Sequence, residues 1–434
     1  MPVFSRRARR FGPAALVLGV AAVFLAPVPA VSAPPKADGM VCTSNPANTF
    51  SLDARDGYIS TPDGNSIYAW SYTGRGTNFQ LPGPVLCVDS GVVVTVILHN
   101  TLPEDTSITF SGQQHVKANG HAAQPQVGGS GQLTSLTDVA AAGNGSVTYT
   151  FTSGSPGTYL YESGTDVAKQ REMGLYGALV VRPSGTAGQA NTRGDSAFDL
   201  GHEYLYLLSE IDPNLHLAVE RKQSYDVTKT TARYFLINGR SMPDTIAANY
   251  AAWLPAQPYG ALIHIRPFVP GDPNNKPSLV RYLNAGSVNY PFHPHGNDQR
   301  VITRDGQALQ GAAGSDASYD KFLVDVGPGQ SVDTLDQWVD AEHWNAQSNP
   351  IPVPLPQLQD QIIGPGTETW FSENPYLGGA PGQLPPGVVQ NNQCGEYYQV
   401  AHSHALEQAT NFGASFGGMM TLIRIDPPNG CVTP

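Results

Sequence analysis

The chain has 434 residues, of which only 14% are charged, whereas glycine (46) and proline (37) are abundant. So few charged helix formers among so many helix breakers exclude a helical bundle or coiled coil and favour short strands joined by turns. The formal net charge of −11 disfavours an electrostatic nucleic-acid binder, which needs a basic surface. We therefore expect an all-β protein of two or three domains with no nucleic-acid partner.

The N-terminal residues 1–33 have the pattern of an export signal. Four arginines between residues 6 and 10 precede an apolar run, Ala14–Ala26, which is too short to anchor the chain stably in a bilayer. Small residues suited to cleavage follow, ending at Ala30 and at Ala33. The sequence leaves general and twin-arginine export both open. We expect a mature protein that is secreted or held in the cell envelope and that has no stable membrane anchor.

Two segments show the sequence pattern of short strands separated by turns, and we assign them as domains at 42–183 and 200–428. A stretch at 184–199, rich in Gly, Ala, Ser and Asn, is the expected linker. A Pro/Gln-rich insertion at about 345–393 interrupts the second domain. The strands expected in the first domain are Val92–His99, Ser146–Thr152, Gly157–Tyr161 and Gly177–Arg182. Those expected in the second are Glu203–Leu208, Tyr234–Asn238, Ala261–Arg266, Leu279–Leu283, Phe322–Val326, Tyr397–Ala401 and Thr421–Ile425.

Few segments favour helix. Only Asp166–Met173 and Ser403–Thr410 are rich in helix-compatible residues. Strict alternation in Ser146–Thr152 predicts that Val147, Tyr149 and Phe151 share one buried face. Because no βαβ succession is present, a doubly wound parallel sheet is excluded.

Four cysteines are present: Cys42, Cys87, Cys394 and Cys431. In an oxidising compartment an even number predicts two disulfides, and the sequence leaves all three pairings open. No two of them form a CxxC pair, which argues against a zinc ribbon or a thioredoxin-type redox site.

Two of the histidine motifs could carry chemistry. His293 and His295 form one HxH pair, and His402 and His404 form another. On an extended strand, positions i and i+2 point to the same face, so each pair offers two imidazoles side by side. If the two strands are neighbours, four imidazoles converge, which suits Cu, Zn, Fe or Ni. The remaining histidines stand apart, and we expect them to be structural: His99, His115, His121, His202, His216, His264 and His343.

Longer stretches resemble the multicopper oxidases. Tyr290–Gly296 (YPFHPHG) resembles their HPxHxHG segment, and Ala401–Gln408 (AHSHALEQ) resembles their C-terminal HCHxxxH segment. Further stretches resemble strands of their first domain: Pro82–Val88, Val94–Asn100, Tyr159–Ser163 and Gly174–Val181. The resemblance implies two cupredoxin-like domains, each a Greek-key β-barrel or sandwich, with copper as the cofactor.

The resemblance also marks where this chain departs from the family. In the family, the first domain gives four histidines to a trinuclear copper cluster. The matching positions here lie in Thr109–Gly112 and Glu162–Gly164, and neither stretch contains a histidine. The family's mononuclear (type 1) copper uses two histidines and a cysteine, and the matching positions here hold Tyr290, Ser403 and Gln408. Two-domain relatives build clusters between trimer subunits, but a homo-oligomer of this chain would not supply the missing ligands.

Three functions remain open on these grounds. The first is an exported protein that binds copper, or another divalent ion, through the four imidazoles and has little or no laccase-type activity. Water, Glu162 or Tyr290 could complete its coordination. The second is a metal-free cupredoxin-fold binding or scaffold protein. The third is an active copper oxidoreductase with atypical ligands; the sequence gives no substrate for it.

Overall fold

The computed structural model describes residues 38–268, 271–273, 275–296, 298–338, 397–413 and 417–426. All of these residues belong to one compact unit, Pro35–Pro434. The expected export signal, the 345–393 insertion, and both Cys394 and Cys431 lie outside the described residues. In the described ranges, no helix is both long and apolar enough to cross a membrane.

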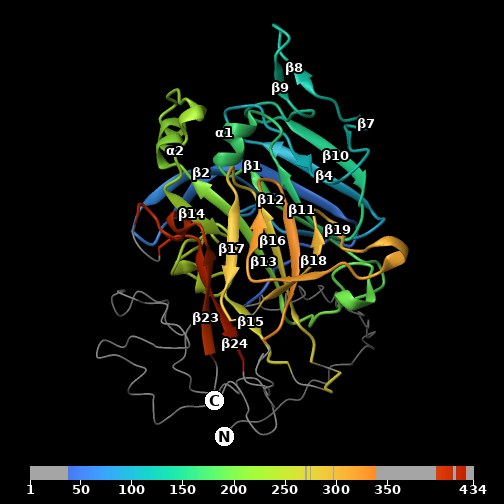
Figure 1. Cartoon of the computed structure of the whole chain (residues 1–434). Coiled ribbons are helices and arrows are strands. Elements are labelled where there is room, and N and C mark those ends of the chain that lie inside the picture. The colour runs from blue at the N-terminus through green and yellow to red at the C-terminus, as the bar shows by residue number, and fades with distance from the viewer. Residues whose placement is uncertain are drawn as a thin grey trace, which may run out of the picture. The chain divides into compact units, whose positions relative to one another are not determined.

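The N-terminal half forms a pair of sheets, which we call the first sheet pair (Figure 1). Its six-stranded sheet has, in spatial order, β2 (Ser66–Gly74), β1 (Thr49–Ser60), β4 (Val93–Asn100), β10 (Ser146–Thr152), β6 (Lys117–Ala118) and β7 (His121–Ala122). Its four-stranded sheet has β3 (Leu86–Asp89), β12 (Tyr176–Arg182), β11 (Gly157–Glu162) and β5 (Thr109–Phe110). A separate two-stranded ribbon contains β8 (Gln126–Val127) and β9 (Leu133–Ser135).

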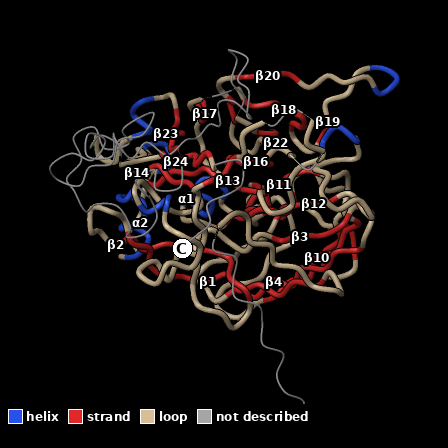
Figure 2. Tube along the Cα trace, turned by 90° about the horizontal axis from the view of Figure 1, so that it is seen from below, coloured by secondary structure: helices blue, strands red, loops and turns tan. Residues whose placement is uncertain are grey.

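The C-terminal half forms the second sheet pair. Its seven-stranded sheet has β14 (Tyr234–Ile237), β13 (Glu203–Ile211), β16 (Ser278–Asn284), β22 (Ser331–Asp336), β18 (Gln299–Arg304) and β19 (Gln307–Ala308), with β20 (Tyr319–Lys321) paired to β18. Its five-stranded sheet has β15 (Ile263–Ile265), β24 (Met420–Ile425), β23 (Tyr397–Ser403), β17 (Tyr290–Pro294) and β21 (Val324–Val326). Figure 2 shows β17, β23 and β24 together, on the side away from β1 and β4.

The two sheet pairs repeat one topology. In the larger sheets, β1 runs parallel to β4 and antiparallel to β2, as β13 runs parallel to β16 and antiparallel to β14. In the smaller sheets, β3 is parallel to β12 as β15 is parallel to β24. Strand β11 lies between β12 and β5, as β23 lies between β24 and β17. The β5–β11 pair therefore corresponds to the β17–β23 pair, while the exact domain boundaries stay a prediction.

Burial follows the period of two that the sequence predicts. Val147, Tyr149 and Phe151 of β10 are all buried, and they pack in the core of the first sheet pair. A second core fills the other sheet pair. The all-β prediction is confirmed, although long strands such as β1 and β2 were not predicted because polar residues interrupt their apolar pattern.

The helices are short. α1 (Val167–Glu172) confirms the first helical prediction. The second was wrong in part, because β23 extends to Ser403 and only a 3-10 turn follows at Leu406–Ala409. α2 (Pro213–Glu220) was not predicted; the Asp212 side chain caps its N-terminus by accepting from the backbone N–H of Asn214. Further 3-10 turns lie at Gly194–Ser196, Val227–Lys229, Asp244–Ile246 and Ala312–Gly314.

Apolar and charged contacts both join the two sheet pairs. A third apolar cluster mixes residues of β11 and β12, such as Leu160 and Ala178, with residues of β13, such as Leu207. Beside it, Arg182 of β12 pairs with Glu203 of β13, and the hydroxyl of Thr158 in β11 donates to Oδ1 of Asp333 in β22. The fully buried Arg281 of β16 lies within ion-pair distance of both carboxylates. Because a buried charge is costly unless it is paired, this arrangement fixes how the two sheet pairs meet.

A pair of carboxyl groups lies at the same junction. The backbone N–H of Asp212 donates to Oε1 of Glu172 at 2.6 Å, and the backbone N–H and hydroxyl of Ser287 both donate to Oε1 of Glu210 at 2.6 Å. Burial, together with the neighbouring Glu210 carboxyl, raises the pKa of Glu172 to about 8. Burial also raises the pKa of Glu210.

We predict that Glu172→Gln makes stability less dependent on pH. The folded state holds a proton at Glu172 that the unfolded chain releases near a pKa of about 4.3, so the free energy of unfolding should fall as pH rises from about 5 to about 8. A glutamine cannot titrate, yet its amide oxygen can still accept from Asp212. Urea unfolding across this range should show that the free energy of unfolding of Glu172→Gln falls less steeply with pH than that of the wild type. The difference in slope should correspond to at most about one bound proton.

Glu407→Gln is the matched control, because Glu407 is exposed to solvent. It should keep the wild-type slope. An identical slope for wild type and Glu172→Gln would contradict the prediction.

Candidate metal centre

The candidate site is built on two neighbouring strands. β17 and β23 are antiparallel, and their register sets His293 directly opposite His402. Along β17, Tyr290, Phe292 and Pro294 are buried, whereas His293 and the following His295 are half-buried on the other face. Strand alternation therefore places the imidazoles on the outer face of the five-stranded sheet.

The four predicted histidines lie together. The ring centroids of His293 and His295 are 4.7 Å apart, and those of His402 and His404 are 6.0 Å apart. Across the strands, the His293 ring lies 5.8 Å from that of His402 and 5.3 Å from that of His404. The His295 ring lies 5.2 Å from that of His402. The condition set by the sequence, that the two HxH strands be neighbours, is met.

Backbone carbonyl groups orient two of these rings. Nδ1 of His402 lies 2.8 Å from the carbonyl oxygen of Ser403, and Nδ1 of His293 lies 2.6 Å from that of Phe322. A carbonyl oxygen only accepts, so each Nδ1 carries the hydrogen and donates it, and Nε2 of the neutral ring is then an acceptor. Histidines that bind metals through Nε2 commonly have their Nδ1–H held in this way.

The Nε2 atoms of His295 and His402 face each other at 3.1 Å. Because Nε2 of neutral His402 is an acceptor, Nε2 of His295 donates to it. Two imidazole nitrogens about 2.0–2.1 Å from one tetrahedral ion would be about 3.3 Å apart, so an ion could take the place of the shared hydrogen. Burial lowers the pKa of His402, and the surrounding imidazoles lower it further against the opposing hydrogen bond to Ser403. The neutral form, which binds metals, is thereby favoured.

The four rings lie close together, but their nitrogen atoms are not arranged around one point as the ligands of a bound metal ion would be. Among the residues that the structure describes, no group of three or more His, Cys, Asp or Glu side chains is placed to hold a metal ion. His295 and His402 therefore supply the pair with suitable spacing, and His293 and His404 would have to turn toward it. His404 is exposed, so little packing opposes its rotation.

The positions that the sequence resemblance matches to the type 1 copper ligands lie on the core-facing side of these strands and in the 3-10 turn that follows β23. Ser403 is fully buried, and its hydroxyl donates to Oε1 of Gln408 at 2.5 Å. Gln408 in turn donates to the carbonyl oxygen of Asn289 at 3.0 Å. The hydroxyl of Tyr290 donates to Oε2 of Glu210, which holds the phenol in the core. Tyr290 is therefore not available to complete a site on the imidazole face.

The corresponding strands of the first sheet pair carry no imidazole. In the β5–β11 pair, Thr109 lies opposite Glu162. Oε2 of Glu162 lies 3.6 Å from the guanidinium of Arg171, and burial raises the pKa of this carboxyl. Next to it, the buried hydroxyls of Ser107 and Thr165 are 2.8 Å apart.

A hollow of about 880 Å³ adjoins the imidazoles. His293 and Phe322 lie on its wall with the charged residues Asp298, Arg300 and Asp320. Sequence reasoning missed both this hollow and the carbonyl group of Phe322, because they depend on loops whose approach to β17 leaves no sequence pattern.

Comparisons with known proteins find a family match in the first sheet pair, outside the imidazole cluster. Residues 67–186 match the family model described as multicopper oxidase. Copper resistance protein A of Escherichia coli is 29% identical over 177 residues, covering 39% of this chain and 26% of that protein. A probable nitrite reductase-hydroxylamine oxidoreductase fusion protein of Kuenenia stuttgartiensis is 30% identical over 153 residues, covering 34% of this chain and 16% of that protein. The chain thus spans about a quarter or less of these curated relatives.

Solved structures show the same fold at low identity. The blue copper oxidase from Nitrosomonas europaea superimposes with a TM-score of 0.55 at 19% identity, covering 86% of this chain and 85% of that one. The laccase from Botrytis aclada gives a TM-score of 0.50 at 16% identity, covering 92% of this chain and 56% of that one. The predicted cupredoxin-like architecture is therefore confirmed. The chain is multicopper-oxidase-like: residues 67–186 match that family in sequence, and 86% of the chain superimposes on the fold of a solved blue copper oxidase.

Proposed function

We propose that this is an exported copper-binding protein with little or no laccase-type oxidase activity. The copper ligands are His293, His295, His402 and His404. The observation that carries the proposal is the β17–β23 register, which sets these imidazoles on one face with two Nε2 atoms 3.1 Å apart. Imidazole nitrogen is a good ligand for copper.

The chain's own residues prepare the ligands. The carbonyl oxygens of Ser403 and Phe322 hold the Nδ1–H groups of His402 and His293. The Nε2 lone pair of His402 faces His295 and would be presented to an ion between these two rings. An ion between His295 and His402 would take the place of the shared hydrogen, which the neutral His295 ring would carry on Nδ1 instead of Nε2. Copper bound there supplies a centre that can exchange one electron. Water and the rings of His293 and the exposed His404 would be the remaining ligands.

Low oxidase activity follows from the opposite face of the strands. A blue copper site needs a cysteine thiolate beside its histidines, and Ser403 supplies none. The hydroxyl of Ser403, the amide of Gln408 and the phenol of Tyr290 are instead engaged in hydrogen bonds. Without a type 1 copper, nothing would accept electrons from a substrate. Four-electron reduction of dioxygen would then lack its first step, the oxidation of the substrate.

Export rests on the N-terminal sequence pattern and on one structural feature. Cys42 and Cys87 form a disulfide, which persists in oxidising compartments outside the cytoplasm.

One observation favours a second candidate, a metal-free binding or scaffold protein. Within the described part of the chain, no three potential ligands are already placed for one ion. In that case the imidazole cluster would be a remnant without a ligand, and the adjoining hollow would be the binding surface.

We predict that the purified protein binds about one equivalent of Cu(II). His402→Ala/His404→Ala should weaken binding by at least about 100-fold, because even changes beyond the direct ligands cost 10- to 100-fold. Isothermal titration with elemental analysis after gel filtration measures both affinity and stoichiometry.

His115→Ala/His121→Ala is the matched control, because it also removes two imidazoles, both exposed and both in the first sheet pair. It should bind copper as the wild type does. Wild-type protein that retains no copper would support the metal-free candidate, and equal loss in both double variants would show non-specific binding by surface histidines.

We predict a structural role for the buried Ser403 hydroxyl. Ser403→Ala leaves the Gln408 amide oxygen without its donor and should lower the free energy of unfolding by about 1–3 kcal/mol. Copper affinity should change little, because the side chain faces away from the imidazoles. Ser155→Ala, which removes an exposed hydroxyl, is the control in the same urea titration. A loss of copper binding in Ser403→Ala without a loss of stability would place this residue in the metal site instead.

A further inference from the structure

The disulfide occupies a distinctive position at the junction of the two sheet pairs. Cys42 lies in the N-terminal segment, and Cys87 lies in β3. Cys87 is buried, at 7% exposed, whereas Cys42 is only half-buried. A reagent from solvent can therefore approach the sulfur of Cys42 rather than that of Cys87.

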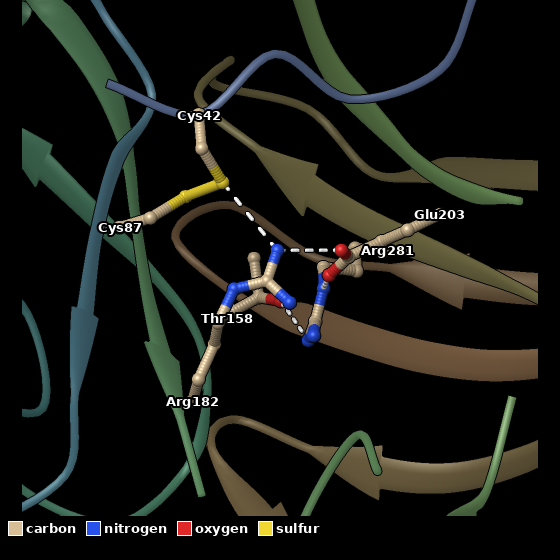
Figure 3. The surroundings of a disulfide bond; sticks show 6 residues. All are labelled: Cys42, Cys87, Thr158, Arg182, Glu203 and Arg281. Atoms are coloured by element: carbon tan, nitrogen blue, oxygen red, sulfur yellow. Dashed lines mark hydrogen bonds and ion pairs between the residues drawn. A yellow bond between two sulfur atoms is a disulfide. The ribbon is translucent and has the colours of Figure 1, made fainter. Parts of the chain in front are cut away.

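A guanidinium group touches the accessible sulfur. Nη2 of Arg182, at the end of β12, lies 3.4 Å from Sγ of Cys42 and 2.5 Å from Oε2 of Glu203 in β13 (Figure 3). A fixed positive charge beside a cysteine sulfur favours the thiolate over the thiol. The same guanidinium thus serves both the disulfide and the contact between the two sheet pairs.

Around the disulfide, the number of positively charged side chains equals the number of negatively charged ones as long as the disulfide is intact. Glu203 is shared between Arg182 and the fully buried Arg281. Arg281 also lies 3.2 Å from Oδ2 of Asp333, whose Oδ1 accepts from the hydroxyl of Thr158 in β11. Two cations therefore face two carboxylates, and a thiolate at Cys42 would add a third negative charge beside them.

We propose that Cys42–Cys87 is a thiol-exchange site for a dithiol reductant, with Arg182 as the group that stabilises its reduced form. One thiolate of the dithiol attacks Sγ of Cys42. The Cys42–Cys87 bond breaks, its electron pair passes to Cys87, and that buried sulfur takes up a proton. The second thiolate of the dithiol then attacks its own mixed-disulfide sulfur, and Cys42 leaves as a thiolate beside Arg182. Two electrons have reached the protein, and the dithiol has become a cyclic disulfide.

Reduction also changes the junction of the sheet pairs. The new Cys42 thiolate competes with Glu203 for Arg182, so the contact between β12 and β13 weakens. The disulfide thereby couples the redox state of the surroundings to the docking of the first sheet pair on the second. This inference does not depend on copper binding.

Two substitutions should shift the redox equilibrium in opposite directions. Arg182→Met removes the cation and should make the disulfide about tenfold harder to reduce. Glu203→Gln removes the carboxylate that competes for Arg182, so the disulfide should become easier to reduce. Full-length folded protein is equilibrated with defined ratios of reduced and oxidised dithiothreitol, and alkylation of the Cys42 and Cys87 peptides is measured by mass spectrometry.

The opposite signs separate this account from simple destabilisation, which would ease reduction in both variants. Arg221→Met, at an exposed arginine, is the control and should match the wild type. If Arg182→Met does not fold, Arg182→Gln, which removes the same charge but keeps a polar side chain, takes its place, because easier reduction in Glu203→Gln alone would not exclude destabilisation. Ratios equal to wild type in the folded variants, or easier reduction in Arg182→Met, would overturn the proposal.

Discussion

The pairing of β17 with β23 is the constraint on which the candidate site depends. Antiparallel pairing with His293 opposite His402 sends four imidazoles to the outer face of the sheet and sends Tyr290 and Ser403 into the core. A slip of one residue would exchange the two faces, placing polar rings in the core. The buried Phe292 and Ser403, which also face each other in this register, therefore protect the arrangement of the imidazoles.

The repeated topology shows how two corresponding strand pairs can differ in chemistry. In the first sheet pair, the β5–β11 strands set Thr109 against Glu162, and a buried hydroxyl network surrounds them. In the second, the β17–β23 strands set histidine against histidine. The backbone arrangement is shared, so the difference between a candidate ligand cluster and a closed polar network lies in the side chains alone.

Much of this could be predicted from the sequence, and the reasons are local. The strict alternation of Ser146–Thr152 gave a strand with those bounds, and the two HxH motifs indicated which side chains share a face. The contacts made by Phe322 and Arg182 could not be predicted, because they join elements far apart in the chain. The shape of the hollow beside His293 was out of reach for the same reason.

X-ray absorption at the copper edge of copper-loaded protein tests the central claim most directly, because it reports the atoms bound to the metal. Our account predicts a first shell of nitrogen and oxygen with the outer-shell scattering of at least two imidazole rings, and no sulfur. A sulfur scatterer at bonding distance, or copper bound without imidazole, would contradict the account.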